Sequence, residues 1–106
     1  MRLEYRLELS EVGVPRFSVE AQEGIAKLFT LATLVFNVLD SRPSVEIVFH
    51  GLNREDPGRK IVAFREILGS VESEAPLAFG EGQSGQIGDS SSYYQWLTIR
   101  RTSDQA

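Results

Sequence analysis

His50 is the one histidine of this 106-residue chain, and histidine is the side chain best suited to acid–base catalysis near neutral pH. It ends the β-branched and aromatic run 45–50, which predicts a strand. Glu46 lies on the same side of that strand, but four residues along a strand span about 13 Å, too far for a hydrogen bond. A carboxylate that orients His50 must therefore come from a neighbouring strand, with Glu4 and Glu8 as candidates. A lone histidine at a strand end is more often structural, so a catalytic His50 is the alternative interpretation.

A second group of residues has the composition of a binding surface. Trp, Tyr and Arg are enriched at protein interfaces, because they combine a large contact area with directional hydrogen bonds. Alternation along the predicted strands 45–50, 60–67 and 93–101 places such side chains together on the sheet face turned away from the helix. A solvated face whose opposite charges pair across strands is the competing interpretation. The candidate binding residues are Trp96, Tyr94, Arg100, Arg59 and Arg65.

The segment 80–85 matches the letters G-x-G-x-x-G of nucleotide-binding loops. Such a loop must lead into a helix within a strand–helix–strand unit, and no helix is predicted after Gly85. We therefore expect the Gly- and Ser-rich segment 80–92 to be a loop that holds no phosphate.

Composition argues against several other chemistries. The chain has no cysteine, which excludes disulfides, thiolate nucleophiles and Cys-ligated metals, and one histidine cannot build a multi-histidine metal site. Eleven Lys and Arg against fifteen Asp and Glu give a net charge of -4, the wrong sign for a protein that binds the phosphates of nucleic acid. No signal-peptide pattern opens the sequence, and the longest apolar stretch, 25–39, is too short and too often interrupted by polar residues to span a membrane. We expect no metal, no cofactor, no nucleic acid and no membrane partner, and a cytoplasmic location.

Hydrophobic patterning predicts the elements that must position these residues. Strict alternation over 2–9 is typical of a half-buried strand, with Leu3, Tyr5 and Leu7 inward. The full predicted order is a strand over 2–9, a helix over 19–39 capped by Ser18, strands over 45–50 and 60–67 joined as a hairpin, one helical turn or loop over 68–74, a short strand over 75–79 and a strand over 93–101.

This order predicts an α+β domain in which one long amphipathic helix packs on a four- to five-stranded antiparallel or mixed sheet. If the segment 68–74 is a degenerate helix, the arrangement becomes a ferredoxin-like variant. A single domain is expected over 1–101, and 102–106 is a polar tail expected to fray.

The predicted helix has a wider apolar arc than one side of a small sheet can cover. The side chains around Leu28, Leu31, Val35 and Phe36 are therefore expected to form an interface. The segment 68–92, a second copy of the chain or another protein could cover them.

Three functions are compatible with these features. The first is a small cytoplasmic protein-interaction or dimerisation module without catalytic activity of its own. The second is a small enzyme or a binder of small anionic molecules, with His50 as the acid–base residue, Arg59 or Arg65 on the anion, and a pocket between the sheet and the 68–92 segment or at a subunit boundary. The third is an inhibitor or antidote subunit whose acidic 68–92 segment covers a basic partner. We expect the first, with a homodimer or another protein as the assembly.

Overall fold

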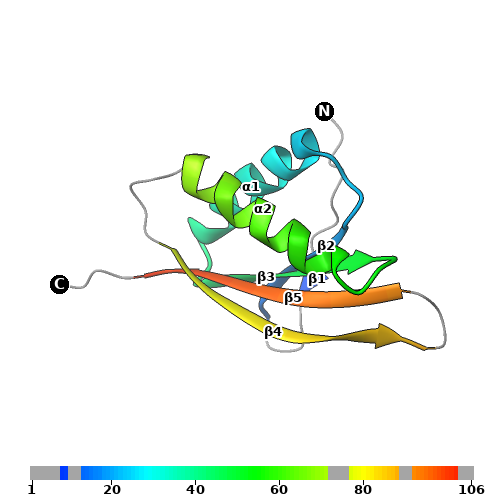
Figure 1. The fold of residues 1–106 in the computed structure, drawn as a ribbon. Coiled ribbons are helices and arrows are strands. Elements are labelled where there is room, and N and C mark those ends of the chain that lie inside the picture. Colours follow the sequence, from blue (N-terminus) through cyan, green and yellow to red (C-terminus); the bar gives the residue numbers. More distant parts are fainter. Residues whose placement is uncertain (1–7, 10–12, 72–76, 89–91, 103–106) are drawn as a thin grey trace.

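Two helices lie against one face of a mixed β-sheet in the computed structural model (Figure 1). The structure describes residues 8–9, 13–71, 77–88 and 92–102. Its elements in chain order are β1 Glu8–Leu9, β2 Pro15–Glu20, α1 Ile25–Leu39, β3 Ser44–Gly51, α2 Asp56–Val71, β4 Leu77–Ile87 and β5 Ser92–Arg101. The predicted α+β class is confirmed.

The sheet has the strand order β1-β2-β3-β5-β4. β2 and β3 are parallel, and the other neighbouring pairs are antiparallel. Two helices on one face give the two-layer arrangement of the ferredoxin-like variant, although β2 and β3 are direct neighbours instead of being split by another strand. None of the helices in the described part of the chain is long and apolar enough to cross a membrane.

Residues 15–20 form a strand, so the predicted N-cap at Ser18 and the helix start at residue 19 are wrong. Phe17 and Val19 are buried while Ser18 is exposed, which is the period-two pattern of a strand with one buried face. Pairing with β3 satisfies the main chain here, and it outweighs the local capping preference of serine. The helix begins only after Gly24, which makes no side-chain cap.

The predicted strand over 60–67, and its hairpin with 45–50, are also wrong, because this segment belongs to the helix α2. Ile61, Phe64 and Leu68 are fully buried, and their spacing of three and four residues is helical. The Asp56-Pro57-Gly58 triplet, which looks like a turn, begins the helix. Proline is tolerated in a first helical turn, and an acidic residue suits its positive end.

The Gly- and Ser-rich segment predicted as a loop over 80–92 is for the most part a strand. β4 runs from Leu77 to Ile87 and pairs with β5 along its length, with an irregularity between Glu81 and Ser84. The short strand predicted over 75–79 is therefore the beginning of a longer one. Pairing with β5 overrides the weak strand preference of the glycines.

Two predicted strands are confirmed, 45–50 as part of β3 and 93–101 as part of β5. Of the predicted strand over 2–9, only Glu8 and Leu9 are described, and they form β1. Leu3, Tyr5 and Leu7 lie outside the described residues, as do residues 103–106 of the predicted tail.

The hydrophobic core fills the space between the sheet and both helices. The Phe49 ring of β3 contacts the Phe64 ring of α2, with centroids 5.9 Å apart. Leu28, Leu31 and Val35 of α1 have no exposed surface, and Phe36 packs partly buried against the same cluster. The structure thus places the expected helix interface inside the core. The unpredicted helix α2 covers much of the wide apolar arc of α1, since the two helices pack on one another above the sheet.

Gly51 ends β3 where the first turn of α2 approaches closely. A methyl group on Gly51 would lie 2.7 Å from the Asp56 Cβ and 3.0 Å from the Pro57 Cδ. We predict that Gly51→Ala lowers the free energy of unfolding by about 1–3 kcal/mol, because the backbone must shift. Gly69→Ala in α2, where the added methyl meets no atom within 4 Å, should raise it by up to about 1 kcal/mol. Urea denaturation followed by circular dichroism measures both, and equal effects would contradict the packing described here.

Candidate functional site

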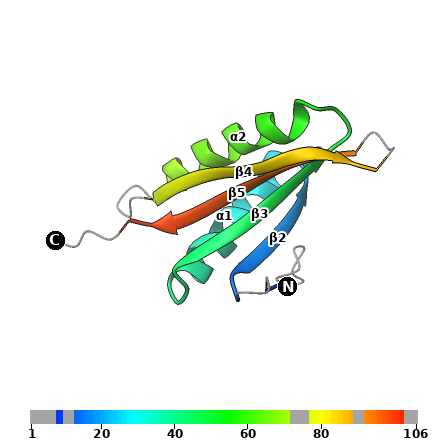
Figure 2. The same cartoon turned by 90° about the horizontal axis from the view of Figure 1, so that it is seen from below.

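The sheet face opposite the helices carries much of the predicted binding surface. Figure 2 looks onto this face and shows β2, β3, β5 and β4 with the helices on the far side. We call it the open face and define it by the outward side chains of β2, β3 and β5. In strand order these are Arg16, Ser18, Glu20, Ser44, Glu46, Val48, His50, Tyr94, Trp96, Thr98 and Arg100.

A hollow of about 380 Å³ lies near the middle of the open face. Val48 is only 8% exposed and lies beneath its neighbours, while Trp96 and Tyr94 contribute aromatic walls. The described residues that line it are Arg16, Ser18, Val48, His50, Gln83, Tyr94 and Trp96. We call this the Trp96 hollow. It combines an aromatic surface with hydrogen-bonding groups from four neighbouring strands.

Arg16 is held at the edge of the hollow by two neighbours. Its guanidinium carbon lies 4.5 Å from the centroid of the Trp96 ring, which is a cation–π contact. Its Nε lies 3.5 Å from the Glu46 Oε1, and both atoms are buried without a hydrogen bond, so the attraction between them is ionic. Arg16 was missing from the predicted site because β2 was not predicted. The sequence did contain a signal for it, because residues 16–20 alternate between polar and apolar side chains, as in a strand with one buried face.

Ser18 and His50 lie within hydrogen-bond distance, with the serine Oγ 3.1 Å from the histidine Nε2. This distance suits a serine nucleophile beside a histidine base. Among the described residues, no carboxylate contacts the His50 ring, so the third member of a triad is missing. The proposed helper Glu4 lies outside the described residues, and Glu8 is aligned with Arg16 rather than with Ser18. The Ser18 contact could not be seen in the sequence, because it depends on the register between β2 and β3.

Gly85 of β4 makes room for the Tyr94 ring of β5. A methyl group on Gly85 would lie 3.1 Å from the Tyr94 hydroxyl oxygen, whereas one on Gly82 would be in ordinary contact with the Trp96 Cβ, at 3.4 Å. The G-x-G-x-x-G match is thus part of a strand, and its last glycine accommodates a neighbouring ring. Packing of an aromatic ring over a strand glycine is a recognised stabilising arrangement.

Arg59 and Arg65 do not lie on the open face, because the segment that carries them is a helix on the other side of the sheet. Arg65 stacks over Phe79 at 4.4 Å from the ring centroid, and its Nη1 lies 3.4 Å from the Glu81 Oε2. Arg59 is exposed on α2. Of the five predicted binding residues, the open face brings together Trp96, Tyr94 and Arg100.

The acidic segment predicted to cover a basic partner is not a free loop where the structure describes it. Glu81 lies in β4, where it pairs with Arg65 and accepts a hydrogen bond of 2.9 Å from the Gln95 amide. The other acids of that segment, Glu72, Glu74 and Asp89, lie outside the described residues.

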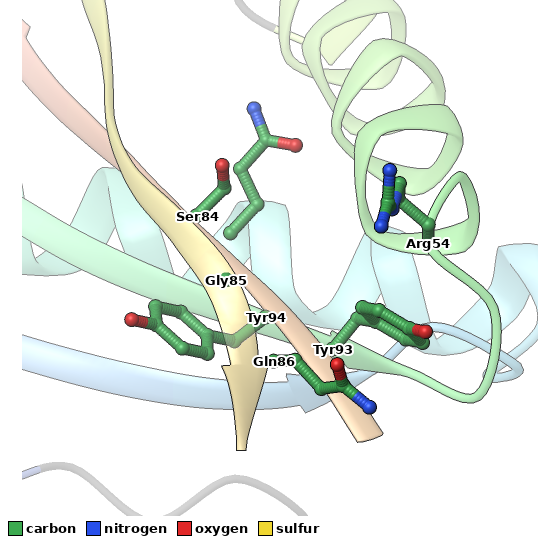
Figure 3. A pocket seen from close by; sticks show the side chains of 7 residues that line it. Arg54, Ser84, Gly85, Gln86, Tyr93 and Tyr94 are labelled. Atoms are coloured by element: carbon green, nitrogen blue, oxygen red, sulfur yellow. The ribbon is translucent and has the colours of Figure 1, made fainter. Parts of the chain in front are cut away.

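A second pocket, of about 420 Å³, lies between the β4–β5 hairpin and the loop that precedes α2 (Figure 3). The described residues of its lining are Arg54, Ser84, Gly85, Gln86, Tyr93, Tyr94 and Gln95. We call it the Arg54 pocket. It differs from the pocket expected between the sheet and the 68–92 segment, because residues 77–87 of that segment are a strand of the sheet, and Arg54 rather than Arg59 or Arg65 lines it. The sequence did not reveal this pocket, because the segment predicted as a strand over 60–67 is helical and most of the loop predicted over 80–92 is the strand β4.

Comparison of the chain with models of protein families, with curated protein sequences and with solved structures finds no match. The interpretation of both sites therefore depends on their own geometry.

Arg16 and Arg100 allow a matched test of the contacts on the open face. We predict that Arg16→Ala lowers the free energy of unfolding by about 1–3 kcal/mol, because it removes the cation–π contact and leaves a buried oxygen of Glu46 without its counter-charge. Arg100→Ala should change it by less than about 0.5 kcal/mol, since Arg100 is exposed. Chemical denaturation of the two variants beside the wild type measures the difference, and a larger loss for Arg100→Ala would contradict it.

Proposed function

We propose that this chain is a protein-interaction module that self-associates through the open face of its sheet. The observation that carries the proposal is the exposure of a Trp–Tyr–Arg surface, with a hollow beside it, on the side of the sheet that neither helix covers. Trp, Tyr and Arg beside a pocket are the composition of an interface hot spot. Arg16 and Trp96 already hold each other in place, so their ordering on binding costs less conformational entropy.

The charges of the open face favour a second copy of the chain as the partner. On β2, β3 and β5 the face carries two arginines, Arg16 and Arg100, and two glutamates, Glu20 and Glu46. This balance contrasts with the net charge of -4 of the whole chain, which makes two copies repel elsewhere. A surface of balanced charge can associate with itself, whereas a purely acidic one cannot.

The order of these charges along the strands suits a two-fold arrangement. Arg100 is aligned with Ser44 at the start of β3, whereas Glu20 is aligned with His50 near its end. Two open faces stacked with their strands antiparallel bring the acidic end of each copy towards the basic end of the other. Two-fold dimers of this self-complementary kind are the most common soluble oligomers.

The test compares Trp96→Ala with Phe29→Ala, which truncates an exposed aromatic side chain on α1, away from the open face. We expect light scattering over a concentration series to give a dimer for the wild type and for Phe29→Ala. Trp96→Ala should weaken the dimer at least about 30-fold in Kd, the loss expected for a hot-spot residue. Circular dichroism verifies that both variants fold.

A wild-type mass that stays at 11.8 kDa over the whole series would overturn self-association. Equal dimerisation of the two variants would instead place the interface elsewhere on the chain. The open face would then lose its proposed role.

A second candidate function is acyl transfer, which the Ser18–His50 distance of 3.1 Å favours. In this proposal His50 Nε2 takes the proton of Ser18 as the hydroxyl oxygen attacks the carbonyl carbon of an ester, and it returns that proton to the leaving alkoxide. It ranks second because no described carboxylate contacts the histidine.

A fluorophosphonate probe tests the acyl-transfer candidate, since it reacts with activated serine hydroxyls. We expect mass spectrometry to find the label on Ser18, and both Ser18→Ala and His50→Gln to abolish it. Ser44→Ala is the control, because Ser44 lies on the same face away from His50. Absence of label on the wild-type chain would exclude an activated Ser18.

A further inference from the structure

We infer that the Arg54 pocket binds a small organic anion through a single carboxylate or phosphate group. The pocket lies where β3 ends and the loop to α2 begins, and the β4–β5 hairpin forms its other side. Its volume of about 420 Å³ is in the lower part of the range of small-molecule sites, which is about 300–1,000 Å³. Ligands commonly occupy the carboxyl ends of parallel strands, where β3 has this pocket.

Among the described residues that line the pocket, Arg54 carries the one formal charge, and it is positive. The other described lining residues are serine, glycine, glutamine and tyrosine. Asp56, two residues further on, accepts a hydrogen bond from the Asn53 amide at 3.3 Å. A guanidinium group in a recess of neutral hydrogen-bonding groups favours an anionic ligand.

Among the described residues, Arg54, Arg59 and Arg100 have no carboxylate partner, and of these only Arg54 lines the pocket. Arg16, Arg65 and Arg101 each lie within 3.5 Å of a carboxylate oxygen. Within the described residues, the Arg54 side chain makes no hydrogen bond or ion pair. In a chain with more acidic than basic residues, an arginine without a carboxylate at a pocket has its hydrogen-bonding capacity available for a ligand.

Two hydroxyl groups can complete the recognition of the ligand. Figure 3 shows Arg54 beside the first turn of α2, Tyr93 below it on β5, and Ser84 across the pocket on β4. The side chains of Tyr93 and Ser84 also make no hydrogen bond within the described part of the chain. The tyrosine ring provides a flat apolar surface for the body of the ligand, and both hydroxyls can donate to anionic oxygen atoms.

This site lies largely apart from the proposed dimer surface, with Tyr94 as the residue that lines both the Arg54 pocket and the Trp96 hollow. Successive residues of a strand point to opposite sides, and Figure 3 shows Tyr93 and Tyr94 extending in different directions from β5. Trp96, on which the dimer proposal depends, does not line the Arg54 pocket. Because the dimer test changes Trp96 and the anion test changes Arg54, failure of one proposal is distinguishable from failure of the other.

The experiment is a titration of the full chain followed by ¹H–¹⁵N NMR at constant ionic strength. Phenyl phosphate and benzoate are the anionic probes, and benzyl alcohol is the uncharged control probe. Arg54→Gln removes the charge from the pocket, and Arg59→Gln makes the same change on an exposed arginine of α2 outside it. The spectra themselves verify that both variants remain folded.

We expect one of the two anions to produce saturable shifts of the Ser84, Tyr93 and Gln95 amide signals in the wild type and in Arg59→Gln. Arg54→Gln should weaken that binding by about tenfold or more, the loss expected for a charge-assisted hydrogen bond. Preference for phenyl phosphate would identify a phosphate-bearing ligand, and preference for benzoate a carboxylate-bearing one. No saturable shift below about 10 mM, equal binding by Arg54→Gln and Arg59→Gln, or equal binding of benzyl alcohol would each overturn the inference.

Discussion

Burial of one apolar layer between the sheet and two helices is the constraint on which the rest of this structure depends. Both α1 and α2 return along the same face of the sheet, so Phe49, Phe64 and their neighbours lie in a single core. A sheet has two faces, and a chain this short supplies helices for only one of them. Neither helix covers the opposite face, so its side chains, Trp96 and Arg16 among them, are accessible to solvent or to a binding partner.

The open face is ordered by contacts within it rather than by a covering layer. Gly85 leaves room for the ring of Tyr94, and Arg16 lies against both Trp96 and a carboxylate. Such contacts hold large side chains in one conformation before anything binds. Preorganisation of this kind lowers the entropic cost of association. A glycine in a strand weakens that strand, but Gly85 in β4 also gives the Tyr94 ring of β5 the space that a binding surface needs.

β5 separates the two candidate sites because its side chains alternate. Trp96 lies on the open face and Tyr93 and Gln95 line the Arg54 pocket near α2, while Tyr94 lines both the pocket and the Trp96 hollow. The acids and arginines near these sites are largely paired with one another, as Glu81 is with Arg65 and Glu46 with Arg16. Within the described residues, Arg54 makes no ion pair, and unlike the equally unpaired Arg59 and Arg100 it lines the Arg54 pocket.

Local sequence pattern was sufficient to predict the α+β class and the strands at 45–50 and 93–101. It also predicted that Tyr94, Trp96 and Arg100 share one face of the sheet, because alternation within a strand fixes which side chains point to the same side. It failed where neighbours override propensity. Segment 60–67 reads equally as a strand, yet it is helical because Ile61, Phe64 and Leu68 can then be buried together. The pairing of β2 with β3, and of β4 with β5, brought Arg16 to Trp96, Ser18 to His50 and Ser84 to Tyr93. Those juxtapositions depend on register between distant segments, which no local period encodes.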